Sequence, residues 1–490
     1  MIKARIAYLL KQYGIKSISC DSRAIKPSSA FFAIKGQVLD GNQFIQEALI
    51  KGAIVFTNNP NQKLKRVFFC SNIRLALAFA AEILYPKSPK NLIAITGTNG
   101  KSSVVSYVYQ ILKLLGAKSA TIGTLGVEST VKINSSFLKT LPPFLTTPDP
   151  ITFRKISNKL NHIGIDYLAF EASSHGIYQN RLGNIKVETI GFTSFSQDHL
   201  DYHKNIEDYL RTKLQLFINN LKENGEVVIN SNILESESFS CIIKDFLQKK
   251  GVRYFLVGKD GDIKINNVKT SFRGSKVYFQ YRGRNYQFIT NIVGSFQATN
   301  LLIAAKIVTN LGMNFDRIIK VIKHVHSVTG RLQRISDIED DAQVFIDYAH
   351  TPEALEKSLS ELRKIKVKNG KLYLVFGCGG ERDQSKRLLM GRAACKLSDY
   401  IIVTDDNPRN EDPRKIRSDI LKGLNFAEEI CNRKLAIKTA IGKLKKNDIL
   451  LIAGKGHEEY QLIGNKTFVF SDIKIAKELL ILNRVVLKGK

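Results

Sequence analysis

Long apolar runs are missing from this chain of 490 residues. No stretch approaches the roughly 18 apolar residues that a membrane-spanning helix needs, so we expect no membrane span. The chain begins with MIKARIAYLLKQYG, which has only a brief apolar run and no small-residue cleavage site. Because this is not the pattern of a secretory signal peptide, the sequence predicts a cytoplasmic protein.

Cysteine is also scarce and scattered. No two cysteines form a Cys-x-x-Cys pair, which argues against both a disulfide framework and a zinc site. This usage is typical of a reducing compartment and agrees with a cytoplasmic location. The cysteines are Cys20, Cys70, Cys241, Cys378, Cys395 and Cys431.

Acidic residues are few relative to basic ones. The chain has 74 Lys and Arg against 44 Asp and Glu, which gives a formal net charge of +30. Such an excess raises the alternative of a nucleic-acid-dependent ATPase. The basic residues are spread along the whole chain, however, and we find no basic patch interleaved with aromatics and no known nucleic-acid-binding module. We therefore keep that function as a remote alternative and expect no nucleic-acid partner.

Alternating strand and helix patterns predict an α/β protein with three domains. The length exceeds that of one ordinary domain. We expect an N-terminal α/β domain at 1–88, a central domain with a mostly parallel sheet at 89–328 and a C-terminal α/β domain at 329–490. The segment YPKSPKN, with its two prolines, predicts a linker between the first two domains.

Individual elements are predicted from apolar, β-prone runs and from helical periodicity. In the first domain we expect strands near 17–20 and at 30–36 and 53–57, and helices at 42–51 and 75–84. In the central domain we expect strands at 165–173, 189–195 and 225–231, short antiparallel strands over 252–290, and a helix at 294–312. In the third domain we expect strands at 344–349, 372–377, 400–405 and 448–454, each followed by a polar loop and a helix.

The strongest functional signal lies in the segment 91–116. A short apolar run predicts a buried strand, a glycine turn follows, and a helical pattern begins at the Lys-Ser pair at 101–102. The backbone N–H groups of such a turn and the positive end of the helix dipole form a phosphate cradle. Lys101 is then expected to reach the β- and γ-phosphates of a nucleotide, and Ser102 the Mg²⁺ ion.

Two polar clusters follow consecutive strands of the central domain, at 171–176 and 196–203. An ATP-dependent enzyme needs carboxylate or imidazole ligands for Mg²⁺ near its phosphate cradle. Because the carboxyl ends of parallel strands meet at one edge of a sheet, Glu171 and His199 are well placed for that role.

Four more polar clusters follow the predicted strands of the third domain. Each of them alone could be a turn with solvated charges. Together they predict a cleft lined with Arg and Glu, which suits a zwitterionic ligand. The clusters lie at 347–352, 377–383, 406–409 and 454–458.

With these motifs the sequence resembles the Mur ligases of bacterial cell-wall synthesis over essentially its full length. The resemblance implies a UDP-substrate-binding domain, a P-loop ATPase core and a Rossmann-like C-terminal domain that brings an amino acid. It also implies an ATP-dependent amide ligase that makes a peptidoglycan precursor through an acyl phosphate. It rests on GTNGKSS (97–103), TTPDP (146–150), EASSHGIYQNRL (171–182), DHLDYH (198–203), GSFQATN (294–300), TGRLQ (329–333), DYAHTPEALE (347–356), GCGGERD (377–383), DNPRNEDPR (406–414) and AGKGHEEYQ (453–461).

The resemblance also implies roles for residues of the central domain. Lys213 would be carbamylated by CO₂ to N6-carboxylysine and would join Ser102, Glu171 and His199 as a ligand of Mg²⁺. The catalytic residues would be Lys101, Lys213, His199 and Glu171. ATP, the cosubstrate, would contact Gly97, Thr98, Asn99, Gly100, Lys101, Ser102, Ser103, Asn300, Arg331 and Asp347, and His350 lies in the same motif as Asp347.

Two further substrates are implied. UDP-N-acetylmuramoyl-L-alanyl-D-glutamate would be held by Ser22, Gln37, Val38, Leu39, Thr146, Thr147, Ser173, Gln179 and Arg181. The incoming amino acid, meso-2,6-diaminopimelate, would be held by Arg382, Asp406, Asn407, Pro408, Arg409, Gly454 and Glu458.

The choice of amino acid depends on Arg409. Its guanidinium can hold the far carboxylate of diaminopimelate through paired hydrogen bonds, and L-lysine has no such group. A ligase that adds L-lysine and a ligase similar to folylpolyglutamate synthetase are the alternatives. We expect the enzyme to be a monomer.

Overall fold

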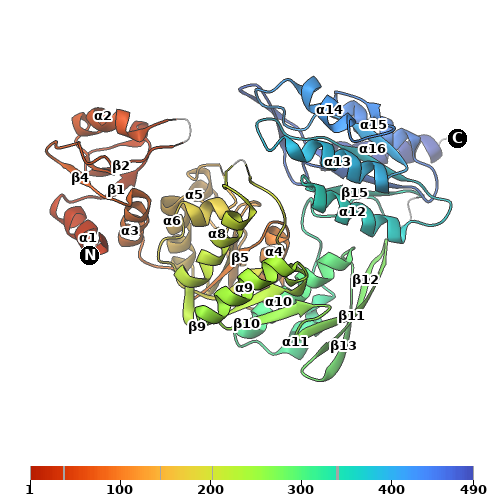
Figure 1. Cartoon of the computed structure of the whole chain (residues 1–490), viewed down its shortest axis with the longest axis horizontal. Coiled ribbons are helices and arrows are strands. Elements are labelled where there is room, and N and C mark those ends of the chain that lie inside the picture. The colour runs from red at the N-terminus through yellow and green to blue at the C-terminus, as the bar shows by residue number, and fades with distance from the viewer. Residues whose placement is uncertain (1, 37–38, 144, 201, 338–340, 489–490) are drawn as a thin grey trace.

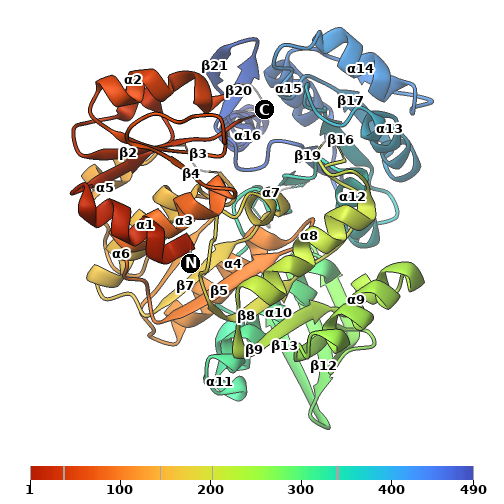
Figure 2. The same ribbon diagram turned by 60° about the vertical axis from the view of Figure 1, so that its left-hand side comes forward.

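The computed structural model describes residues 2–36, 39–143, 145–200, 202–337 and 341–488. Its strands form three main sheets, one after another along the chain, and a separate two-stranded hairpin. In Figure 1 the N-terminal (red), central (orange to green) and C-terminal (blue) parts follow one another along the long axis. In Figure 2 the first and last parts both lie above the central one. The predicted class, an α/β protein of three domains, is confirmed.

The N-terminal sheet is small and wholly parallel, with the strand order β1-β2-β3-β4. Adjacent side chains of β2 point to opposite faces, so Phe32 packs with Ile6 and Leu77 while Phe31 packs with Ala48. Both faces are therefore buried, which explains the continuous apolar run of this strand. Helix α1 and strand β4 were not predicted. The elements are α1 (Ile2–Gln12), β1 (Ser17–Ser19), β2 (Ser29–Ala33), α2 (Ile45–Ile50), β3 (Ile54–Thr57), β4 (Val67–Phe69) and α3 (Ile73–Leu84), with 3₁₀ turns at Ser22–Ala24 and Gly41–Phe44.

The central sheet has the strand order β13-β12-β11-β10-β9-β8-β5-β7-β6 and is parallel from β6 to β11. Helices α4, α10 and α11 cover one face, and α6, α8 and α9 cover the other. The elements are β5 (Asn91–Thr96), α4 (Lys101–Leu114), β6 (Ser119–Ile122), α5 (Ser135–Lys139), α6 (Pro150–His162), β7 (Tyr167–Glu171), α7 (Ser174–Tyr178), β8 (Val187–Phe192), α8 (Ile206–Asn219), β9 (Leu221–Asn230), α9 (Glu237–Lys249), β10 (Tyr254–Gly258), β11 (Ile263–Ser271), β12 (Gly274–Tyr281), β13 (Arg284–Thr290), α10 (Ser295–Asn310) and α11 (Phe315–Ile322), with a 3₁₀ turn at Ser231–Leu234.

One prediction for this sheet was wrong in part. Strands β11, β12 and β13 are antiparallel as expected for 252–290, but β10 pairs in parallel with both β9 and β11. The reason is that helix α9 joins β9 to β10, and a helical crossover returns the chain in the same direction.

The C-terminal sheet has the strand order β14-β15-β19-β16-β17-β18, and all of its pairs except β14 with β15 are parallel. Helices α12, α13 and α14 pack on one face, and α15 and α16 on the other. The elements are β14 (Gln333–Arg334), β15 (Gln343–Asp347), α12 (Pro352–Ile365), β16 (Leu372–Phe376), α13 (Ser385–Leu397), β17 (Tyr400–Val403), α14 (Pro413–Leu421), β18 (Glu428–Glu429), α15 (Arg433–Lys443), β19 (Ile449–Ala453), β20 (Tyr460–Ile463), β21 (Lys466–Val469) and α16 (Asp472–Lys488).

A second correction concerns the end of this domain. Strand β19 is followed by the hairpin β20–β21 before α16 begins, where a loop leading directly into a helix was predicted. Within the described ranges, no helix is both long enough and apolar enough to span a membrane.

A carboxylate of the C-terminal domain caps a helix of the central domain. Helix α10 begins after Gly294 without a capping side chain of its own. Glu361 of α12 takes that place, because its carboxylate accepts hydrogen bonds from the backbone N–H (2.7 Å) and the hydroxyl (2.6 Å) of Ser295. The helix dipole favours a negative charge at this position, so the contact also ties the two domains together.

We expect Glu361→Ala to lower the free energy of unfolding by about 1–2 kcal/mol, because it removes both capping bonds and leaves the first N–H of α10 unpaired. Chemical denaturation monitored by circular dichroism measures this change. Glu356→Ala, which removes an exposed glutamate of the same helix, is the control and should change stability little. Equal effects of the two substitutions would contradict the capping role.

Candidate active site

The phosphate cradle lies between the end of β5 and the first turn of α4. Gly97 (φ +144°) and Gly100 (φ +88°) have backbone conformations that favour glycine. A Cβ atom on Gly97 would lie only 2.1 Å from Oγ1 of Thr193, so no larger residue fits there. Ser194, which follows β8, holds the turn by accepting a hydrogen bond from the N–H of Asn99 at 2.8 Å. The cradle is therefore fixed by the neighbouring strand.

Two lysine ammonium groups meet at this turn. Nζ of Lys101 donates to the carbonyls of Gly97 (2.9 Å) and Thr98 (2.8 Å), and Nζ of Lys213 donates to the same Gly97 carbonyl at 3.0 Å. Lys213 is fully buried and lies over the ring of Tyr209. Burial lowers the pKa of both amines, and the neighbouring charge of Lys101 lowers the pKa of Lys213 further, to well below its ordinary value.

Three of the predicted metal ligands lie around the cradle. Glu171 ends β7, the strand beside β5, and accepts hydrogen bonds from Thr124 N–H (2.8 Å) and Oγ1 (3.1 Å). The hydroxyl of Ser102 accepts a hydrogen bond from Nη2 of Arg331 at 3.1 Å. Burial holds the pKa of His199 well below its ordinary value, so its ring is neutral and can act as a ligand.

The donor set suits Mg²⁺ better than a transition metal. No group of three or more His, Cys, Asp and Glu side chains forms a metal site among the residues that the structure describes. Glu171, His199 and the Ser102 hydroxyl all line the cleft at the cradle, where a metal ion would also need a further oxygen ligand. Hydroxyl and carboxylate oxygens are the ligands that hard cations prefer, so these residues fit Mg²⁺.

A single cleft of about 360 Å³ runs from the phosphate cradle to the C-terminal domain. It is lined by the phosphate cradle and both polar clusters of the central sheet, and by all four polar clusters of the C-terminal sheet. The predicted site residues in its wall are Thr98, Asn99, Gly100, Lys101, Ser102, Ser103, Thr146, Glu171, Ser173, His199, Asn300, Arg331, Asp347, His350, Arg382, Asp406, Asn407, Arg409, Gly454 and Glu458.

Arg331 and Asp347 occupy the border between the two domains. The guanidinium of Arg331 lies 4.2 Å from the ring centre of Tyr348, in a cation–π arrangement. Asp347 accepts hydrogen bonds from the N–H groups of Leu332 (2.5 Å) and Ala349 (2.6 Å). Burial nevertheless raises the pKa of Asp347 to about 6.

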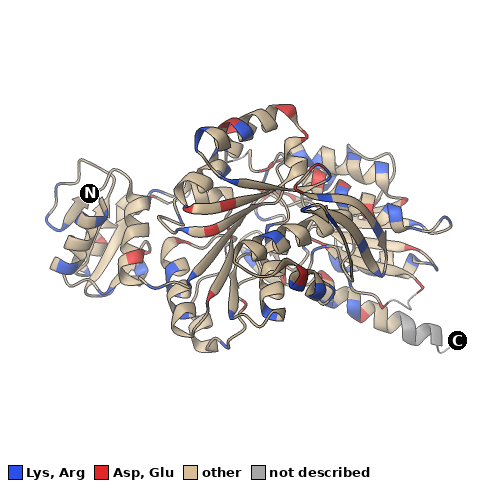
Figure 3. Cartoon of the chain, turned by 90° about the horizontal axis from the view of Figure 1, so that it is seen from below, with Lys and Arg blue, Asp and Glu red and all other residues tan. Residues whose placement is uncertain are grey.

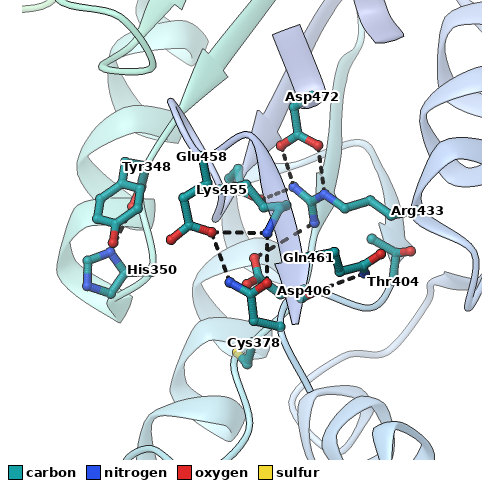
Figure 4. Close-up of polar contacts among 12 residues, drawn as sticks. Tyr348, His350, Cys378, Thr404, Asp406, Arg433, Lys455, Glu458, Gln461 and Asp472 are labelled. Carbon is teal, nitrogen blue, oxygen red and sulfur yellow. Dashed lines mark hydrogen bonds and ion pairs between the residues drawn. The ribbon is translucent and has the colours of Figure 1, made fainter. Parts of the chain in front are cut away.

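The far wall of the cleft belongs to the loops after β17 and β19. Behind it, Arg433 is fully buried and forms a two-pronged ion pair with Asp472, at 2.8 and 2.7 Å, while its Nη1 lies 4.0 Å from Oδ2 of Asp406 (Figure 4). A Cβ atom on Gly454 (φ +112°) would lie 2.5 Å from the same Asp406 oxygen. Glycine at this position therefore allows the two loops to meet.

Arg409, in the loop after β17, is held by the neighbouring loop after β16. Its Nη1 donates to the carbonyl of Gly380 at 2.7 Å, and its Nε and Nη2 make no hydrogen bond to any residue in the described part of the chain. Arg382 is exposed and lines the same cleft. Pro408 does not line the cleft; its carbonyl packs against Gly380.

The residues predicted to hold the UDP-linked substrate fall into two groups. Ser22 and Leu39 lie in the N-terminal domain, Ser22 buried and Leu39 exposed, and neither lines the cleft. Gln37 and Val38 lie outside the described residues. The second group is connected by hydrogen bonds, from Arg181 Nη1 to the Thr147 carbonyl (2.6 Å), from Arg181 Nε to Gln179 (3.2 Å) and between the hydroxyls of Thr147 and Ser173 (3.0 Å).

Sequence reasoning did not identify Lys455, Arg433 or Asp472 as part of this region. Lys455 lies inside the motif AGKGHEEYQ and could have been noticed there. Arg433 and Asp472 are separated by 39 residues and share no local pattern. Only the packing of α15 against α16 brings them together.

Sequence models of three domains match the chain in order. They are described as the Mur ligase family, catalytic domain (residues 14–96), the Mur ligase middle domain (95–308) and the Mur ligase, glutamate ligase domain (330–456). Together they account for most of its length.

Relatives and a solved structure match over nearly the whole chain. A protein of Rickettsia conorii named UDP-N-acetylmuramoyl-L-alanyl-D-glutamate--2,6-diaminopimelate ligase is 50% identical over 474 residues, which are 96% of this chain and 97% of the relative. A protein of Bradyrhizobium diazoefficiens with the same name is 38% identical and covers 94% of this chain and 93% of its own length. A solved structure of a ligase of that name superposes with a TM-score of 0.66 and 29% identity, over 96% of this chain and 95% of the other.

Proposed function

The chain belongs to the Mur ligase family, and from this premise we propose that it joins meso-2,6-diaminopimelate to UDP-N-acetylmuramoyl-L-alanyl-D-glutamate at the expense of ATP. The relatives that it matches over nearly their full length are named for this reaction. The main structural support is the single cleft that connects the phosphate cradle with the Arg- and Glu-bearing wall of the C-terminal domain. Such a cleft places a nucleotide and an amino acid in one cavity.

The reaction has two steps. The D-glutamyl γ-carboxylate attacks the γ-phosphate of ATP, which gives an acyl phosphate and ADP. An amine of diaminopimelate then attacks the acyl carbon, and the tetrahedral intermediate expels phosphate and loses a proton to leave the amide. A cleft between two domains suits this chemistry, because closure would exclude the water that hydrolyses an acyl phosphate.

The nucleotide would lie in the cradle formed by 97–103, with Asn300, Arg331 and Asp347 around it. In the structure Lys101 faces two carbonyls of the turn. Its ammonium would turn to the β- and γ-phosphates when ATP is bound and stabilise the charge that develops during transfer.

Mg²⁺ would be held by Ser102, Glu171, His199 and a carbamate on Lys213. When bound, it would neutralise charge on the phosphate oxygens. The carbamate is supported by the burial of Lys213 and by the nearby ammonium of Lys101, which together favour a neutral amine. A neutral amine adds to CO₂ and, after losing a proton, becomes a carboxylate-like oxygen ligand.

The UDP-linked dipeptide would extend from the N-terminal domain toward the cleft. Thr146 and Ser173 line the cleft beside Glu171 and are the contacts proposed nearest to the reacting carboxylate. Arg181 and Gln179 are proposed to support them through the hydrogen bonds to Thr147 and to each other. Ser22 and the segment 37–39 are proposed for the UDP end.

Diaminopimelate would occupy the wall after β17 and β19, where Asp406 and Glu458 can receive an ammonium group and Arg382 and Arg409 a carboxylate. The amide oxygen of Asn407 already accepts from Lys455 and from the N–H of Leu462, so Asn407 would contact the substrate through its amide N–H. Pro408 and Gly454 would shape the two loops. The Nε and Nη2 groups of Arg409, which make no hydrogen bond among the described residues, support its assignment to the far carboxylate.

We further propose the domain limits 1–88, 89–328 and 329–490, a monomeric enzyme and a cytoplasmic location. The limits are supported by the matches to the three domain models, whose edges lie near them or inside them. Light scattering of the purified protein tests the oligomeric state.

Lys and Arg are distributed over all three domains rather than gathered in one (Figure 3), which gives no support to the nucleic-acid-dependent alternative.

Phosphate release with ATP, Mg²⁺ and UDP-N-acetylmuramoyl-L-alanyl-D-glutamate tests the proposed function. We expect turnover with meso-2,6-diaminopimelate and little with L-lysine, with the extended peptide identified by mass spectrometry. Turnover only with L-lysine would keep the ligase but overturn the assignment of the amino acid. Turnover with neither would contradict the proposal, and a folate substrate would then test the folylpolyglutamate-synthetase-like alternative.

Arg409→Ala should raise KM for diaminopimelate by about 10²-fold, because the far carboxylate loses a charged, two-point partner. KM for ATP should change less than about twofold. Arg414→Ala, which removes an exposed arginine a few residues further along the chain, is the control for both constants. Equal changes in KM for diaminopimelate and ATP would contradict the assignment.

A further inference from the structure

Lys455 is a fully buried lysine directly behind the proposed amino-acid pocket. It follows Gly454 in the loop after β19. Its Nζ donates to Oδ1 of Asn407 at 2.9 Å and to Oε2 of Glu458 at 3.0 Å. Nδ2 of Asn407 also donates to Oε2 of Glu458, at 2.9 Å, so the three side chains form a closed triangle of hydrogen bonds. Figure 4 shows the Lys455 and Glu458 side chains side by side.

Two members of this triangle line the cleft and the third does not. Asn407 and Glu458 are in the cleft wall, whereas Lys455 is shielded behind them. Lys455 therefore cannot contact a ligand and can act on one only through its two partners. The second oxygen of Glu458, Oε1, is not used by the triangle and remains for the ligand.

The charges around Glu458 explain why a buried cation is needed there. Burial raises the pKa of Glu458, and so does the neighbouring carboxylate of Asp406, while Lys455 opposes both. Arg433, Tyr348 and Tyr460 also interact electrostatically with Glu458, and Arg382 and Arg409 share the wall of its pocket. Asp406 already has a cation of its own, Arg433, which Asp472 shares. Lys455 is thus the counter-charge that hydrogen-bonds directly to Glu458.

We propose that Lys455 is a positioning residue for the incoming amino acid: it fixes the Glu458 carboxylate and the Asn407 amide so that Glu458 receives an ammonium group of the substrate as a carboxylate. This inference rests on the proposed function, since it assumes that the pocket binds diaminopimelate. Lys455 itself does not line the pocket; it acts through Asn407 and Glu458, which do.

A purely structural role makes a different prediction. Removing one partner of a buried ion pair lowers stability, because the other charge is left without a counter-charge, but a variant that still folds would then bind its substrates as before. If Lys455 only filled space, Lys455→Met should therefore leave the kinetics unchanged. If it positions Glu458, the same substitution should act on one substrate only and should depend on pH.

The experiment measures KM for diaminopimelate, ATP and the UDP-linked dipeptide between about pH 6 and pH 9 for wild type, Lys455→Met and Lys474→Met. Lys474→Met is the matched control, because it removes a lysine from an exposed pair with Glu459, the neighbour of Glu458. We expect Lys455→Met to raise KM for diaminopimelate roughly 10- to 100-fold near neutral pH, with the other two KM values within about twofold of wild type.

The pH dependence has a defined sign. Without Lys455 the pKa of Glu458 rises further, so the carboxyl group is protonated over a wider range and no longer binds an ammonium group well. The increase in KM should therefore be largest at low pH and become smaller as the pH rises. In a Glu458→Gln background, where no carboxyl group titrates, Lys455→Met should add little and its pH dependence should disappear.

A second variant guards against loss of folding. If Lys455→Met is not folded by circular dichroism, Lys455→Gln is measured in its place; its amide N–H can still donate to Glu458 but carries no charge, so we expect a smaller increase in KM for diaminopimelate with the same pH dependence. Unchanged KM for diaminopimelate, equal changes for all three substrates, or an effect that persists in full in Glu458→Gln would overturn the inference. Absence of diaminopimelate turnover in wild type would instead overturn the proposed function, so the two failures are distinguishable.

Discussion

Lys101→Ala is expected to lower the rate of phosphate release by about 10³-fold or more while the chain stays folded. The ammonium group of Lys101 lies at the phosphate cradle and donates to two backbone carbonyls of the turn. It can leave these carbonyls when a phosphate group binds. Such an ammonium group stabilises the charge that develops during phosphoryl transfer. Electrostatic stabilisation of this kind is commonly the largest contribution to catalysis, so its removal should slow the reaction strongly.

The measurement is phosphate release at saturating substrates, together with circular dichroism to verify folding. Lys113→Ala is the control, because Lys113 is an exposed lysine near the other end of the same helix, α4. Its rate should match that of wild type. A folded Lys101→Ala enzyme with an ordinary rate would contradict the assignment of 97–103 as the phosphate cradle.

Lys213→Ala is expected to lower the rate by about 10²- to 10³-fold, because the proposed carbamate supplies a metal ligand that alanine cannot replace. Alanine also leaves a cavity beside Tyr209 and the Gly97 carbonyl. A short carboxylate such as acetate or formate fits such a cavity and provides the same oxygen ligands. We therefore expect added carboxylate to restore part of the activity.

The control is Gln215→Ala, an exposed position two residues further along α8, which should neither lose activity nor respond to carboxylate. The modification itself can be observed independently of turnover, as a carbamate signal in ¹³C NMR after exposure of the wild-type enzyme to labelled CO₂. Full activity of Lys213→Ala, or a loss that no short carboxylate relieves, would count against the carbamate.

The order of elements and the strand ends that meet at the cleft followed well from local patterns. The run before Gly97, the glycine turn and the helix from Lys101 lie where the strand, turn and helix signals predicted them. Glu171 and Asp347 end their strands as expected. These predictions succeeded because they depend on neighbouring residues and on the rule that ligands bind beyond the carboxyl ends of parallel strands.

Predictions that depended on connections between elements were less successful. The predicted direction of β10 was wrong because a helix of ordinary composition, α9, lies between β9 and β10 and returns the chain in the direction of β9. The hairpin β20–β21 was missed because both strands are short and largely exposed, so they lack a clear apolar alternation.

The sequence by itself determined the class of fold, the family and the strand, glycine turn and helix at 91–114, because residue type and spacing within single segments specify these. The tertiary structure decided which distant groups meet. It placed the amine of Lys213 on the carbonyl of Gly97, 116 residues away, and the carboxylate of Glu361 on the first turn of α10, 66 residues away. It also buried Lys455 between Asn407 and Glu458. Such contacts depend on how helices cross between strands and on what is shielded from water, and no local pattern along the chain records either.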